Sequence, residues 1–225
     1  FITDQHNPWF LENTKTVKYC VDIDEKNFGL SRSDAETATA SAIDYWKSQL
    51  AKVESWTSIP DFSFRLGTQN YIKSTCDDTT DIRFQFGVFT KEQMDKLPNP
   101  KGHVGFTIRT DYDPISMKGK GFIYISPESG PLALEVNKGD NTKFWSDYLG
   151  AFRLQSILVH ELGHTLGISH NNELNLMRED FPSTMIQVEA ASIHYSLPEN
   201  LLIPDFSRKG ATLAMCLDGS SKTLA

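Results

Sequence analysis

The pattern of apolar and polar residues predicts five short strands along the chain. Apolar residues occupy every second position from Val17 to Val21, inside the segment 15–24, and this is the period of a half-buried strand. Two further segments, 62–66 and 82–86, show the same alternation, and 105–109 and 121–126 are two more short strand candidates. The chain between the second and third of these five segments is expected to be a loop.

Two longer stretches repeat their apolar residues at spacings of three and four, which is the period of an amphipathic helix. The first opens on a capping-box sequence from Ser33 to Glu36 and continues to about Val53. The second begins near Tyr148. We expect it to end near Gly167, because glycine readily adopts the left-handed conformation that terminates a helix.

Helical periodicity is lost after Gly167. Segment 171–204 is rich in Asn and Pro, which predicts irregular chain, and a last helix is expected over about 205–215. The pattern and the length together predict an α+β fold in a single domain, residues 1–225. Its N-terminal lobe is expected to cover about 1–167 and a smaller irregular C-terminal lobe about 168–225.

Composition and charge narrow the classes of function. The 225 residues are 39% hydrophobic and 23% charged, as in ordinary globular domains. A net charge of -7 argues against nucleic acid as a partner, and no stretch approaches the roughly 18 apolar residues that cross a bilayer. We expect a monomer without a membrane span. The chain begins at Phe1, so a signal or pro-segment is expected to have been removed from a secreted, cell-surface or periplasmic protein.

Three widely separated cysteines leave at least one thiol unpaired within a monomer. Cys20 lies among alternating apolar residues and is expected to be a small buried hydrophobe. If one disulfide forms, the expected pair is then Cys76 with Cys216.

The segment HELGHTLGISH, residues 160–170, contains three of the six histidines. Residues four apart lie on one face of a helix, so His160 and His164 can direct their imidazoles at one point. His170 is six residues further and would be rotated away on a continuous helix. Gly167 permits the bend that brings it back, so the three histidines are predicted to bind one metal ion.

Three histidines with an adjacent glutamate are typical of catalytic zinc. Three imidazoles leave the fourth position of Zn²⁺ open for water, unlike a closed structural site. Glu161 follows the first ligand but is turned by about 100 degrees around the helix, so it can accept a proton from that water without binding the metal. Glu161 is therefore the candidate general base.

The length of the pattern decides how specific it is. HExxH alone arises by chance on amphipathic helices. Five specified residues at fixed spacing occur in on the order of one in ten million random windows. Two alternatives remain: a non-catalytic zinc-binding or interaction protein, for which Glu161 would be unnecessary, and a hydrolase acting on bonds other than peptides.

The segment HELGHTLGISH resembles the HExxHxxGxxH signature of the metzincins, a family of zinc endopeptidases. The approach SILVHELGH, the opening strand and long helix, and the closing helix are similar to a matrixin catalytic domain, of a bacterial type. The resemblance implies a twisted, mostly parallel five-stranded mixed sheet with two long helices. It also implies an active-site cleft between the two lobes and hydrolysis of protein or peptide substrates.

The resemblance also implies a methionine turn beneath the zinc. Met185, in a Ser-x-Met sequence, is favoured over the alternative Met177, which lies nearer the matrixin spacing. Some relatives place a tyrosine near the metal two residues after this methionine. Gln187 and Glu179 stand at those positions here, so no tyrosine ligand is expected.

Three further expectations concern substrate and additional ions. The resemblance implies a substrate paired to an edge strand, for which Gly121–Ser126 is the candidate, although an internal strand fits nearly as well. The remaining histidines, His6, His103 and His194, are expected to lie outside the metal site. Two acidic clusters could bind Ca²⁺ but are more typical of solvated loops: Asp77, Asp78 and Asp81 in one, and Asp111 and Asp113 in the other.

Overall fold

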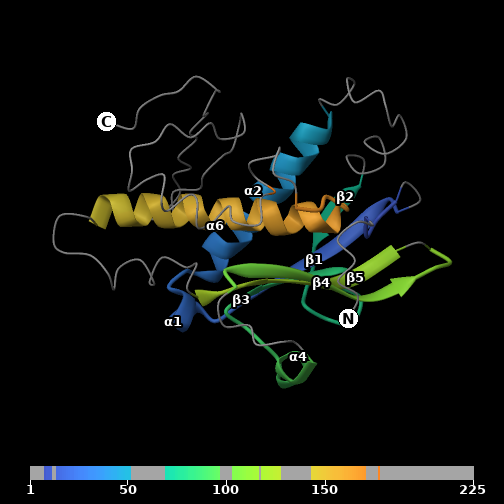
Figure 1. Cartoon of the computed structure of the whole chain (residues 1–225), viewed down its shortest axis with the longest axis horizontal. Coiled ribbons are helices and arrows are strands. Elements are labelled where there is room, and N and C mark those ends of the chain that lie inside the picture. Colours follow the sequence, from blue (N-terminus) through green and yellow to red (C-terminus); the bar gives the residue numbers. More distant parts are fainter. Residues whose placement is uncertain are drawn as a thin grey trace.

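The structure, a computed structural model, describes residues 8–11, 14–51, 69–96, 103–116, 118–127, 143–170 and 177. These residues form a five-stranded sheet with two long helices across one face (Figure 1). The α+β class and the mixed sheet predicted from the sequence are confirmed. The predicted strand 62–66, the predicted helix 205–215 and nearly all of the predicted C-terminal lobe lie outside the described residues.

The sheet is parallel except for one edge strand. Its order is β2-β1-β3-β5-β4, and only β4 runs antiparallel to its neighbour. The strands are β1 (Thr16–Ile23), β2 (Asn70–Lys73), β3 (Ile82–Phe86), β4 (Gly105–Asp113) and β5 (Lys118–Ile125). Four of them cover predicted segments. β2 lies in a segment where a loop was predicted. The prediction missed it because β2 is short and mostly exposed and so lacks an alternating apolar pattern.

The expected edge at Gly121–Ser126 is wrong. Those residues belong mainly to β5, which pairs with β3 on one side and with β4 on the other. The glycines serve a close approach: a Cβ on Gly121 would stand 2.5 Å from the Trp9 ring and 2.1 Å from the Ile108 carbonyl oxygen. The register of β4 against β5 shifts between Arg109 and Asp111, which pair with Gly121 and Lys120.

The two long helices pack on each other and on the sheet. They are α2 (Arg32–Ala51) and α6 (Lys143–Thr165). α2 starts at Arg32, one residue before the predicted capping box. The Ser31 hydroxyl caps the helix, because it accepts a hydrogen bond from the Asp34 backbone N–H. α6 starts five residues before the predicted Tyr148 and ends close to Gly167, as predicted.

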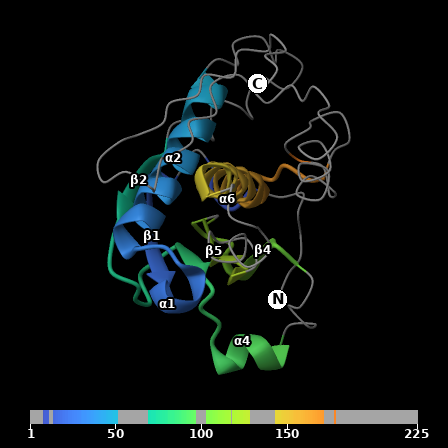
Figure 2. The same ribbon diagram turned by 90° about the vertical axis from the view of Figure 1, so that its left-hand side faces the viewer.

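Two short helices were not predicted. α1 (Glu25–Phe28) lies between Asp24, whose side chain accepts from the Asn27 N–H, and Gly29, whose φ is 74°. α4 (Lys91–Lys96) lies on the other side of the sheet from α2 and α6 (Figure 2). Four to six residues are too few to show helical periodicity, so only local capping could have indicated them.

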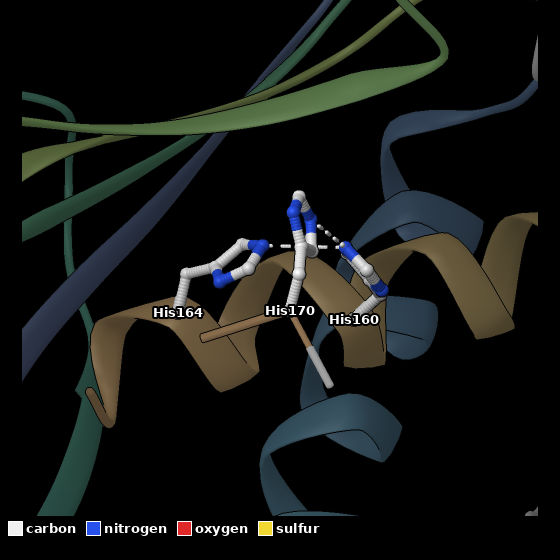
Figure 3. A group of neighbouring side chains, drawn as sticks. All are labelled: His160, His164 and His170. Carbon is white, nitrogen blue, oxygen red and sulfur yellow. Dashed lines mark hydrogen bonds between the residues drawn. The ribbon is translucent and has the colours of Figure 1, made fainter. Parts of the chain in front are cut away.

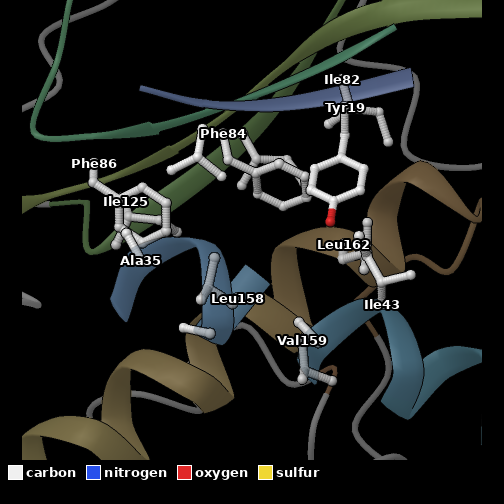
Figure 4. Close-up of a cluster of buried hydrophobic side chains, with 14 of the residues drawn as sticks. Tyr19, Ala35, Ile43, Ile82, Phe84, Phe86, Ile125, Leu158, Val159 and Leu162 are labelled. Atoms are coloured by element: carbon white, nitrogen blue, oxygen red, sulfur yellow. The ribbon is translucent and has the colours of Figure 1, made fainter. Parts of the chain in front are cut away.

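The main core fills the space between the sheet and the two long helices (Figure 4). Inward residues of β1 and β3, such as Tyr19 and Phe84, lie in one cluster with Leu158 and Leu162 of α6. Each fully buried side chain of this size contributes roughly 1.5–3 kcal/mol. This core fixes α6 against the sheet and so sets the position of the histidine motif.

A disulfide joins Cys20 in β1 to Cys76 in the loop after β2. The predicted pair, Cys76 with Cys216, is therefore wrong, and Cys20 is buried but not a free thiol. Parallel pairing of β1 with β2 brings the loop after β2 alongside β1, and linear spacing cannot reveal this.

No helix in the described ranges is both long and apolar enough to cross a membrane.

Candidate metal centre

The C-terminal end of α6 positions two of the three motif histidines. His160 and His164 stand one turn apart on the helix, and both are buried. The helix ends here, and the N–H groups of Leu166 and Ile168 both donate to the Gly163 carbonyl. Gly167 follows with a φ of 80°, in the left-handed region that glycine tolerates. The predicted bend is therefore present, and it turns the chain back toward the helix face.

The bend brings His170 to the other two rings (Figure 3). The Nε2 atom of His160 lies 3.2 Å from Nε2 of His164 and 3.3 Å from Nε2 of His170. Nitrogens bound to one tetrahedral zinc at 2.0–2.1 Å are separated by roughly 3.3 Å. Two of the three Nε2 pairs thus have the spacing that a single zinc ion requires, and the ligand atoms of all three residues lie within 4.8 Å of one another.

His164 is held in the tautomer that a ligand needs. Its Nδ1 lies 2.8 Å from the Ile168 carbonyl oxygen. A carbonyl only accepts, so Nδ1 carries the proton and donates it, which leaves Nε2 with its lone pair toward the other rings. The helix-terminating turn therefore both returns the chain and orients a ring.

Electrostatics keep His164 neutral. Burial, together with His160 and His170 nearby, lowers the pKa of His164 to about 3, although its hydrogen bond with Ile168 acts in the opposite direction. Neutral imidazole is the form that binds a metal. His170 is exposed, so the group is open to solvent on that side.

Glu161 is buried between α6 and β4. Its side chain is only 4% exposed, and its Oε2 lies 2.8 Å from the Thr107 hydroxyl. Burial raises the pKa of Glu161 to about 8, and the hydrogen bond from Thr107 opposes that rise. A carboxyl with a raised pKa can hold a proton near neutral pH, as a group that shuttles protons must.

Met177 packs under the motif. It is fully buried, and a Cβ on Gly163 would stand 2.7 Å from its sulfur and 3.0 Å from the Trp46 ring. The Trp46 indole donates to the carbonyl of Val159, one residue before the first histidine. Gly163 thus lets a sulfur and an indole approach the helix between two histidines. The favoured methionine, Met185, lies outside the described residues.

The other histidines do not join this group within the described residues. His103 is exposed and its ring stands edge-on to Phe106, whereas His6 and His194 lie outside the described residues. In the ranges that the structure covers, residues 160, 164 and 170 form the one cluster of His, Cys, Asp or Glu suited to a metal ion.

The acidic clusters are occupied by protein groups. Asp81 is buried, accepts from the Lys18 backbone N–H at 2.7 Å and pairs with Lys118 Nζ at 2.8 Å. Asp77 accepts from the hydroxyls of Thr75 and Thr79, which lowers its pKa. Asp77 and Asp78 are exposed, as expected of a solvated loop, whereas Asp81 is buried, and these contacts give no support to calcium there.

Asp111 and Asp113 likewise belong to the β4–β5 hairpin. Asp113 accepts from the Ile115 backbone N–H and from the Ser116 hydroxyl, and these hydrogen bonds lower its pKa. Asp111 accepts from the N–H of Tyr112. Their oxygens support the turn between the two strands.

Two site residues escaped prediction. Thr107 and Gly105 lie on β4, two positions apart and so on the same face, and both contact Glu161. The sequence marks 105–109 as a strand but carries no sign of which of its faces meets α6, since this depends on the register of β4 with β5.

No protein-family model matches the chain, and a search of curated proteins finds no significant match. The case for the site therefore stands on the motif and on its geometry.

Proposed function

We propose that this chain is a zinc-dependent endopeptidase of the metzincin type, in which His160, His164 and His170 hold the metal. The observation that carries the proposal is the meeting of three histidines beside a buried glutamate, with Nε2 of His160 at zinc spacing from Nε2 of both other rings. A bound zinc ion would lower the pKa of a water molecule and polarise a carbonyl oxygen. The donor set suits zinc, because imidazole nitrogen is among its common ligands.

Glu161 is assigned the general-base role. It accepts a proton from the attacking water and passes it to the leaving amine. Its burial against β4 supports this role, because the pKa of a carboxyl group shielded from solvent depends on the protein groups around it. The neutral, oriented ring of His164 supports the role of metal ligand.

The proposed substrate is an extended protein or peptide segment. β4 is the sheet edge beside α6, and its residues 105 and 107 contact Glu161. An extended chain added along β4 by main-chain hydrogen bonds would pass close to Glu161. The sequence-based choice of edge is thus replaced by β4.

The protein is proposed to be secreted, on the cell surface or in the periplasm, and to act as a monomer. The Cys20–Cys76 disulfide supports an oxidising compartment, where such bonds persist.

The test is cleavage of an unstructured polypeptide by the zinc-loaded protein, followed by mass spectrometry. The wild type should cut, a chelator should stop it and added zinc should restore it. Glu161→Ala should keep its zinc and lose at least about a hundredfold in rate. Equal cleavage by Glu161→Ala would refute the mechanism. Zinc binding without cleavage by the wild type would favour the non-catalytic alternative.

A further inference from the structure

We propose that Thr107 is a positioning residue for Glu161: its hydroxyl holds the carboxyl group in the orientation in which Glu161 serves as base. The inference rests on the proposed function. It concerns a residue on β4, which reaches the motif only through the fold, 54 positions away in sequence.

The first support is the paired contact of one hydroxyl with one residue. Oγ1 of Thr107 lies 2.8 Å from Oε2 of Glu161 and 2.8 Å from its backbone carbonyl oxygen. The contact therefore ties the side chain and main chain of Glu161 to the same point of β4. The glutamate side chain has three rotatable bonds and loses most of its conformational freedom when one carboxyl oxygen is held by a hydrogen bond.

The second support is the space left by Gly105. A Cβ at this position would stand 3.0 Å from Oε1 and 3.2 Å from Cγ of Glu161. The side chain of Glu161 thus lies directly against the strand, with one oxygen over Gly105 and the other on Thr107. Gly105 and Thr107 together form a seat for the carboxyl group on one face of β4.

The third support is the chemistry of a hydroxyl. A hydroxyl has one hydrogen and two lone pairs, whereas a backbone carbonyl only accepts. The hydrogen of Thr107 can be donated to Oε2 or to the backbone carbonyl oxygen of Glu161, which both lie 2.8 Å from Oγ1. The hydroxyl, which serine keeps and valine lacks, is therefore the group that holds the carboxyl group on β4.

The kinetic test compares Thr107→Val, which has the same shape without the hydroxyl, with Thr107→Ser, which keeps it. Thr107→Val should lose about tenfold to a hundredfold in kcat on the peptide, with KM within about twofold of wild type. Thr107→Ser should recover most of the rate. Thr110→Val, a change on the same strand away from Glu161, is the matched control and should behave as wild type.

A second readout is independent of activity and of metal. Crystal structures of the metal-free proteins should show the Glu161 carboxyl unchanged in Thr107→Ser and rotated away from β4 in Thr107→Val. Melting temperatures of both variants identify any general loss of folding.

The outcomes of these two tests separate the positioning role of Thr107 from the proposed protease function. An unmoved carboxyl in Thr107→Val, an unchanged kcat, or equal losses in Thr107→Ser and Thr107→Val would overturn the positioning role. If the wild type cuts nothing while Thr107→Val still displaces the carboxyl, the proposed protease function fails and the positioning role stands.

Discussion

Two regions of this molecule have the composition of a cation site, and they differ in where their ligand atoms point. At the end of α6, three histidines turn their Nε2 atoms toward one another at 3.2 and 3.3 Å. In the loop before β3, Asp77 and Asp81 turn their oxygens toward threonine hydroxyls, a backbone N–H and Lys118. A cluster of metal-binding residue types is therefore not enough to identify a metal site, because the lone pairs of those residues must also remain available to the ion.

The largest expected effect breaks the histidine side of this comparison. Structural zinc sites bind with about 10–16 kcal/mol shared among their ligands, so His164→Ala should weaken zinc binding by roughly a thousandfold, or about 4 kcal/mol. Competition with a chromophoric chelator measures this. Asp77→Asn is the control and should bind zinc as the wild type does. Equal affinities in His164→Ala and wild type would remove the site.

The disulfide anchors the acidic loop, and its loss comes next in size. Cys20 and Cys76 are 56 residues apart, so closing that loop should stabilise the fold by roughly 2–4 kcal/mol. Urea unfolding of the double variant Cys20→Ser, Cys76→Ser tests the value. Cys216→Ser should keep this disulfide, because the other two cysteines are bonded to each other. A Cys76–Cys216 disulfide found by peptide mapping of the wild type would contradict the prediction.

Removing Asp81 should have a smaller effect on stability. The carboxylate is 1% exposed and its partner Lys118 is partly exposed, so Asp81→Ala should cost about 1–3 kcal/mol by leaving a donor and a charge without their acceptor. Thermal unfolding with and without CaCl₂ provides the check. If calcium raises the melting temperature of the wild type but not of Asp81→Ala, this loop binds the ion after all.

Gly163→Ala should have the smallest effect. The added methyl group meets the Met177 sulfur, which can move, and the rigid Trp46 ring. The cost of overpacking is about 1–3 kcal/mol and is partly offset by the roughly 1 kcal/mol by which alanine favours a helix over glycine. Chemical unfolding should show a net loss near 1 kcal/mol. A clear gain in stability would mean that Met177 and Trp46 do not press on this position.

The fold was predictable where one face of an element is buried in the core. β1, β3 and the part of α6 from Leu154 onward have such a face, and the spacing of their apolar residues predicts them. β2 is mostly exposed and shows no such pattern. The edge of the sheet was misplaced because Gly121 makes room for Trp9, a contact between distant residues.

The candidate site also contains residues that the sequence predicts and residues that it does not. Its histidines and Glu161 lie within eleven residues, so helix geometry and one glycine predict their meeting. Thr107 and the Cys20–Cys76 bond depend on strand register and on strand order, which span more than 50 residues. Local pattern carries no information about such distant partners.

The most direct measurement of the central claim is a crystal structure of the zinc-soaked protein with anomalous scattering at the zinc edge. We predict one strong peak equidistant from the Nε2 atoms of His160, His164 and His170, with no fourth protein ligand. A peak elsewhere, or one enclosed by four side chains, would contradict the account.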